Sequence, residues 1–182
     1  PTEVLKYELR KMQIKLAEES RSTYLTFVKK VWPDFIAGSH HKIFAQKLED
    51  VSRGKIKRLI VNMPPRHTKS EFASHLFPAW MMGKNPKLKI IQTTHTAELS
   101  YNFGRKVRNL FDQDEFKEVF PNVTLSQDSK AAGRFTTNKG GEYFAAGVGG
   151  AITGRGADLL IIDDPHSEQD ALSQTALDNA YE

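Results

Sequence analysis

Three short apolar runs, rich in branched residues, constrain the fold of this chain more than any other feature. They span residues 58–63, 89–94 and 159–164, and the last of them ends in two acids. Runs of this kind are typical of strands that are buried on both faces of a sheet. Helical patterns follow at 71–82 and 97–111, so the alternation predicts an α/β fold with a mainly parallel central sheet and helices on both faces.

The chain before the first of these runs has a different pattern of apolar and charged residues. Apolar residues recur between charges at 3–19 and again at 43–51, which predicts two helices, and the apolar pattern of 27–32 ends at Pro33. We therefore divide the chain into an N-terminal helical extension, 1–56, and an α/β core, 57–182. Within the core, residues 135–137 and 142–146 flank a Lys-Gly-Gly turn and are expected to form a hairpin.

Composition narrows the classes of protein to which the chain can belong. A length of 182 residues suffices for one sizeable hydrophobic core, and the lack of cysteine excludes a disulfide framework and a thiolate metal site. No apolar run approaches the roughly 20 residues that span a bilayer, so no membrane partner is expected. The first 155 residues hold all 26 bases and 15 of the 22 acids. Such a basic body is compatible with a polyanionic partner such as DNA, and equally with a solvated basic surface.

The first motif with a chemical reading lies between the run at 58–63 and the helix at 71–82. A phosphate loop is expected at such a strand–helix junction, because the free N–H groups at the start of a helix favour a bound phosphate. Its residues are Pro65, Arg66, His67, Thr68, Lys69 and Ser70. The alternative is a Pro-Pro strand end followed by an ordinary helix start.

Within this loop, Lys69 would reach the outer phosphates of a nucleotide and the Ser70 hydroxyl would bind Mg²⁺. Arg66 would pair with phosphate oxygens through its planar guanidinium. Thr68 stands where the usual pattern has glycine. We expect an adapted loop, in which Thr68 has an ordinary helical-entry conformation, rather than a strained one.

The second motif is the pair Asp163 and Asp164, which follows four apolar residues. Adjacent acids at a buried strand end are costly unless they meet a metal ion or hydrogen-bond donors. Asp163 is predicted to hold the Mg²⁺ shell, and Asp164 to orient or deprotonate the attacking water. The alternative is an acidic turn at a strand exit.

Together these segments resemble the ATPase domain of the large subunit of viral terminases, the DNA-packaging motors of tailed bacteriophages. The loop 64–70 is similar to the family's divergent Walker A motif, and residues 154–165 resemble its Walker B block with a Gly-Arg-Gly lead-in. Residues 27–41 resemble the region in which the family binds adenine, which places His41, or its neighbour His40, near the base. The resemblance implies a P-loop NTPase fold.

The same resemblance implies a function and partners. A member of this family hydrolyses ATP with Mg²⁺, as a ring of subunits, to drive double-stranded DNA into a procapsid in the cytoplasm of the host cell. Its partners are the portal or procapsid and the small terminase subunit. The family's C-terminal nuclease domain is expected to be absent, so we interpret the chain as a truncated core or a natural short ATPase. Alone, it is expected to be a monomer.

Three catalytic assignments depend on this resemblance. Asp164 stands where many members have glutamate, so Glu168 is the reserve candidate for the catalytic carboxylate. Arg155 is interpreted as an arginine finger that acts on a neighbour's ATP, or as a cap on the strand. Two rival functions stay open: another DNA-dependent P-loop ATPase, such as a helicase-like motor, and a non-enzymatic DNA-binding or assembly module with a decayed loop.

Overall fold

A mixed five-stranded sheet forms the centre of the structure. The computed structural model describes residues 2–150, 152–167 and 169–181. The strands are β1 (Lys89–Thr94), β2 (Leu125–Ala131), β3 (Arg134–Thr137), β4 (Glu142–Gly147) and β5 (Leu159–Ile162), in the spatial order β2-β3-β4-β1-β5. β1 is parallel to both β4 and β5, whereas β3 is antiparallel to β2 and β4. The expected α/β class is confirmed, and so is the hairpin, which β3 and β4 form.

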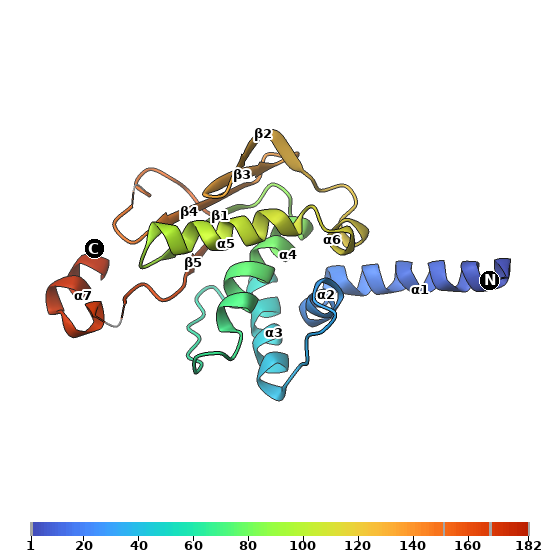
Figure 1. The fold of residues 1–182 in the computed structure, drawn as a ribbon, viewed down its shortest axis with the longest axis horizontal. Helices are drawn as coiled ribbons and strands as arrows, with labels where there is room; N and C mark the ends of the chain where they lie inside the picture. Colours follow the sequence, from blue (N-terminus) through green and yellow to red (C-terminus); the bar gives the residue numbers. More distant parts are fainter. Residues whose placement is uncertain (1, 151, 168, 182) are drawn as a thin grey trace.

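Most of the helices lie to one side of this sheet, and α1 carries the N-terminus away from it (Figure 1). They are α1 (Glu3–Ser22), α2 (Tyr24–Val31), α3 (Ser39–Ser52), the π-helix η1 (Glu71–Leu76), α4 (Phe77–Lys84), α5 (Ala97–Leu110), α6 (Asp114–Val119), the 3₁₀ helix η2 (Asp170–Leu172) and α7 (Gln174–Tyr181). The stretch that follows α5 contains α6 and β2. No helix in the described part of the chain is long and apolar enough to cross a membrane.

Helix α5 covers one face of the sheet. Its N-cap is Thr96, whose side chain accepts a hydrogen bond from the Leu99 N–H, the usual way of satisfying a free donor at a helix start. Its buried residues recur every three or four positions, and they pack on β1 and β4. Under α5 the Tyr143 hydroxyl donates to Gln92 Oε1 at 2.8 Å. On the opposite face Leu160 and Ile162 of β5 are more than half exposed, so this face is open at β5 instead of being covered by a helix as expected.

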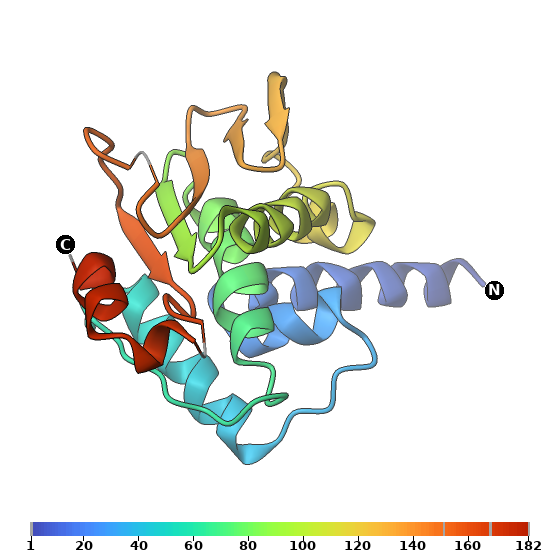
Figure 2. The ribbon, with the colours of Figure 1, turned by 60° about the vertical axis from the view of Figure 1, so that its left-hand side comes forward.

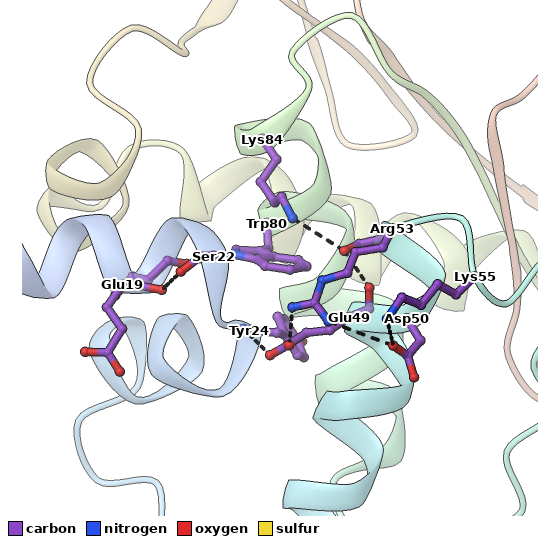
Figure 3. A network of polar contacts seen from close by, with 11 residues as sticks. Glu19, Ser22, Tyr24, Glu49, Asp50, Arg53, Lys55, Trp80 and Lys84 are labelled. Carbon is purple, nitrogen blue, oxygen red and sulfur yellow. Dashed lines mark hydrogen bonds and ion pairs between the residues drawn. The ribbon is translucent and has the colours of Figure 1, made fainter.

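The N-terminal helices share the core of the α/β part through a polar network (Figure 3). Glu49 of α3 accepts the Tyr24 N–H at 2.8 Å and the Arg53 guanidinium at 2.9 Å, and so serves as the cap of α2 from another helix. Trp80 of α4 donates its indole N–H to the Ser20 carbonyl at 2.9 Å. These bonds join α1, α2, α3 and α4 into one packed unit.

The apolar run 58–63 is not a strand, which corrects the sequence-based expectation. The segment has no regular secondary structure, and Ile60 is 87% exposed. β5 is the edge of the sheet on this side (Figure 2), and a cleft of about 870 Å³ lies between it and residues 56–62. A strand needs a neighbouring strand to pair its backbone groups, and in the described part of the chain none is placed beside this run.

Candidate functional site

The loop that precedes η1 contains two residues with left-handed backbone conformations. Arg66 has φ 62° and Thr68 has φ 60°. The expected helical-entry conformation of Thr68 is therefore wrong. A β-branched residue adopts this conformation only with strain, so other contacts must hold Thr68 in place.

Two hydrogen bonds hold the Thr68 side chain. Its Oγ1 donates to the His67 carbonyl at 2.7 Å and lies 2.7 Å from His41 Nε2. Because His41 Nδ1 accepts the Gly38 N–H at 2.9 Å, the network assigns the proton to Nε2, which donates to Thr68. Burial, with smaller contributions from His40 and His67, lowers the pKa of His41 and favours this neutral ring.

Aromatic rings surround His41 beside the loop. Ring centroids lie 3.8 Å away for His40, 4.8 Å for Phe35 and 5.2 Å for Phe72. Trp32 extends the group, 5.1 Å from Phe35. The structure thus places the residues that were expected on the adenine side next to the expected phosphate loop, where ring faces can stack on a flat ligand.

Lys69 lies against both acids of the second motif. Its Nζ is 2.7 Å from Asp164 Oδ1 and 3.8 Å from Asp163 Oδ1. The two acids differ in environment, since 8% of the Asp163 side chain and 62% of the Asp164 side chain is exposed. A buried carboxylate and an exposed carboxylate are suited to different tasks, the first to holding an ion and the second to meeting water.

Backbone contacts fix the two acids at the carboxyl end of β5. The Asp163 N–H donates to the Thr93 carbonyl at 2.9 Å, and the His95 N–H donates to the Asp164 carbonyl at 3.2 Å. Asp164 has a φ of 45°, a left-handed conformation that turns the chain directly after Asp163. The parallel pairing of β5 with β1 therefore delivers the acids next to the loop.

Ser74 and His95 belong to this site and were not singled out from the sequence. Ser74 Oγ donates to Asp163 Oδ2 at 2.8 Å in a buried contact. Ser74 lies one helical turn after Ser70, which is half-buried in the first turn, and this spacing was the signal available in the sequence. Ser74 lies in η1, a π-helix, an element that is frequent at functional sites.

The 870 Å³ cleft connects these groups to the open edge of the sheet. Lys69, Asp163 and Asp164 line its polar end, and Leu160 and Ile162 are among the residues that line the remainder. Its volume is in the range of ligand-binding clefts, about 300–1,000 Å³. A charged group can therefore approach Lys69 and the acids from this side.

The remaining predicted residues are not gathered at one place. Pro65, Arg66 and His67 are exposed in the loop. Arg155 lies near the amino ends of the parallel strands, with Nη1 3.3 Å from Glu142 Oε1 and its guanidinium 3.9 Å from the centre of the Phe144 ring. It is thus separated from the acids by the length of β5, and Glu168 lies outside the described residues.

The potential metal ligands in the loop and at the acidic pair suit a hydrated magnesium ion better than a metal ion enclosed by protein ligands. In the part of the chain that the structure describes, no three His, Cys, Asp or Glu side chains are placed to hold a metal ion. Mg²⁺ is usually held by one or two carboxylates together with phosphate oxygens and water. A site with a single buried carboxylate, Asp163, is of that kind.

Comparison of the chain with protein-family models, with curated proteins and with solved structures found no match.

Proposed function

We propose that this chain binds ATP with Mg²⁺ and hydrolyses it, as the ATPase part of a viral DNA-packaging motor of the terminase type. The observation that carries the proposal is the position of Lys69, whose ammonium is 2.7 Å from Asp164 and 3.8 Å from Asp163 across a sequence separation of more than ninety residues. A lysine at the start of a helix, facing acids at a strand end, is the arrangement by which P-loop NTPases hold the outer phosphates and Mg²⁺.

Each residue has a distinct part in the proposed reaction. The Lys69 ammonium exchanges its carboxylate partner for the outer phosphates, and the N–H groups of the loop and the helix start contact the remaining phosphate oxygens. Asp163 and Ser70 would hold a Mg²⁺ ion, which would neutralise charge on the phosphates, and Ser74 keeps the Asp163 carboxylate in position. The exposed Asp164 carboxylate orients the attacking water. Water attacks the γ-phosphorus, the bond to the β-phosphate oxygen breaks, and ADP and inorganic phosphate leave.

The packaging role and its partners rest on the resemblance of the two motifs and on the basic character of the first 155 residues. Double-stranded DNA is the proposed substrate of translocation, with the portal or procapsid and the small terminase subunit as partners in the cytoplasm of the host cell. Arg155 lies too far from Asp163 to act within one chain, so its proposed role as an arginine finger is toward a neighbouring subunit in a ring.

A turnover assay tests the proposed reaction. Lys69→Ala and Asp163→Asn are expected to abolish Mg²⁺-dependent ATP hydrolysis, and Asp164→Asn to stop hydrolysis while sparing binding. Loss of hydrolysis in Glu168→Gln together with full activity in Asp164→Asn would transfer the catalytic role to Glu168. Full turnover in Lys69→Ala would reject the phosphate-loop assignment.

The partner that stimulates turnover separates packaging from its rivals. Stimulation that requires a portal or procapsid is expected for a packaging motor. DNA-stimulated turnover with strand unwinding would indicate a helicase-like motor instead. Failure to bind ATP in the presence of Mg²⁺ would indicate a non-enzymatic DNA-binding or assembly module.

A further inference from the structure

Helix α1 carries an apolar stripe on its solvent-exposed surface. The helix extends from the rest of the molecule and forms one end of it (Figure 1), and its buried residues, Ala17 and Ser20, lie near its last turn. Four apolar residues on the exposed part are between 42% and 66% accessible and form the stripe: Leu5, Leu9, Met12 and Leu16. A free helix of this length is marginal in water, so cover by a partner would stabilise it.

The stripe has the spacing of a helix–helix seam. Its members are separated by four, three and four residues, which is the alternation of a and d positions in a heptad. At about 100° per residue all four fall within an arc of about 60°. Val4, Tyr7 and Ile14 are also exposed, but they lie outside the seam, Tyr7 and Ile14 on the opposite side of the helix.

The charges beside the stripe identify the partner as a second copy of the same helix in the opposite direction. Leu9 and Leu16 occupy a positions, so Glu8 and Lys15 occupy g positions on one flank. In an antiparallel pair g faces g, and a two-fold axis between residues 10 and 11 brings Glu8 of each copy against Lys15 of the other. Leu9 then packs on Met12 of the second copy. In a parallel pair, Glu8 would face the neutral Gln13 instead.

The same register fits the length of the exposed helix. It places Leu5 opposite Leu16 of the second copy, and the first residue of that helix, Glu3, level with residue 18. Near residue 18, α1 joins the rest of the molecule (the body), as the hydrogen bonds from Trp80 to the Ser20 carbonyl and from Arg21 to the Val119 carbonyl show. The two bodies would therefore sit at opposite ends of the helix pair.

We propose that α1 mediates antiparallel pairing between two copies of this chain. Three to four turns of helix make a small interface, below the roughly 1,200 Å² of stable complexes. The pair is therefore expected to be weak, with the chain a monomer when dilute and paired only at high concentration. The pairing is independent of the proposed ATPase activity, because it involves none of the residues of the loop or of the acidic pair.

Sedimentation equilibrium from about 10 µM to about 1 mM, on the whole chain, tests the pairing. Glu8→Lys and Lys15→Glu each convert two attractions into two repulsions, so each is expected to raise the dimer Kd at least about tenfold. An equal mixture of the two variants restores both attractions and is expected to pair as the wild type does. Lys11→Glu, the same change outside the seam, is the matched control and should leave the Kd unchanged.

Three results would overturn the proposal. The first is a wild-type chain that stays monomeric up to 1 mM, which would mean that the stripe serves a different partner. The second is a mixture of the two charge variants that pairs no better than either alone. The third is an effect of Lys11→Glu as large as that of Lys15→Glu, which would show a response to net charge. Because these residues are exposed, circular dichroism should report the same fold for every variant.

Discussion

Thr68 combines a β-branched side chain with a left-handed backbone conformation. Substitutions at this position can distinguish the effect of backbone strain on stability from the effect of the side-chain hydrogen bonds. For an L-residue this conformation costs roughly 1–2 kcal/mol, and glycine does not pay this cost. The Thr68 hydroxyl offsets part of it, because it accepts from His41 Nε2 and donates to the His67 carbonyl, both at 2.7 Å. Two substitutions that both delete the hydroxyl therefore differ in the strain that they leave.

Thr68→Gly relieves the strain but loses both hydrogen bonds of the hydroxyl, about 0.5–1.5 kcal/mol each, and adds freedom to the unfolded chain, about 0.5–1 kcal/mol. Its free energy of unfolding is expected to fall by about 1 kcal/mol, because the relieved strain offsets part of these losses. Thr68→Val loses the same two hydrogen bonds, so that the Nε2–H of the buried His41 is again without its acceptor, but it keeps the branched shape and the strain. It should lower the free energy of unfolding by about 1–3 kcal/mol.

Urea unfolding followed by circular dichroism measures both variants, with Thr68→Ser as the control that keeps the hydroxyl. Serine should remain within about 0.5 kcal/mol of the wild type. A valine variant as stable as the wild type would refute the role of the His41 contact. A glycine variant less stable than the valine variant would refute the strain.

Three further changes test other parts of the structure. The hydrogen bond from His75, with Lys106 also contributing, lowers the pKa of Glu71 from 4.5 to about 2, although burial opposes this shift. The ionised Glu71 therefore stabilises the fold above pH 4.5, and this contribution is lost as the pH falls toward 2. Glu71→Gln should flatten this part of a plot of melting temperature against pH. Glu49→Ala removes the charged cap of α2 and should lower the free energy of unfolding by about 1–3 kcal/mol in urea, whereas Glu49→Gln should cost less. Gly104→Ala would place a Cβ 2.0 Å from a backbone carbonyl oxygen and should lower the free energy of unfolding by about 3 kcal/mol or more. As the control, Gly156→Ala adds a Cβ that meets nothing within 4 Å, so its free energy of unfolding in the same assay should stay within about 0.5 kcal/mol of the wild type.

The elements that the sequence predicted well are those whose signal is local. The strand at 89–94, the strand before Asp163 and the helix after Thr96 lie where their patterns placed them. The run 58–63 has an equally strong apolar pattern but is not a strand. The propensity for β structure describes how a residue fits beside neighbouring strands, and the position of the sheet edge at β5 is a tertiary property that the run itself does not contain.

The site shows the same division between local and tertiary information. The meeting of Lys69 with Asp163 and Asp164 could be predicted, because a loop before a helix and the carboxyl end of a parallel strand lie at the same edge of such a sheet. The contact of Ser74 with Asp163 could not be predicted in detail, because a π-helix changes which residues face the strand. The hydrogen bond between Thr68 and His41 joins segments far apart in the sequence, so no local sequence pattern predicts it or the left-handed conformation of Thr68.

Calorimetric titration of a non-hydrolysable ATP analogue in the presence of Mg²⁺ tests the central claim, that Lys69 and the two acids form a nucleotide-phosphate site. The wild-type chain is expected to bind one analogue per chain, and binding should weaken when Mg²⁺ is removed. Lys69→Ala should lower the affinity at least about a hundredfold, near 2.7 kcal/mol, whereas Lys87→Ala, which removes an exposed lysine elsewhere, should not change it. Equal affinity in the wild type and in Lys69→Ala would contradict the claim.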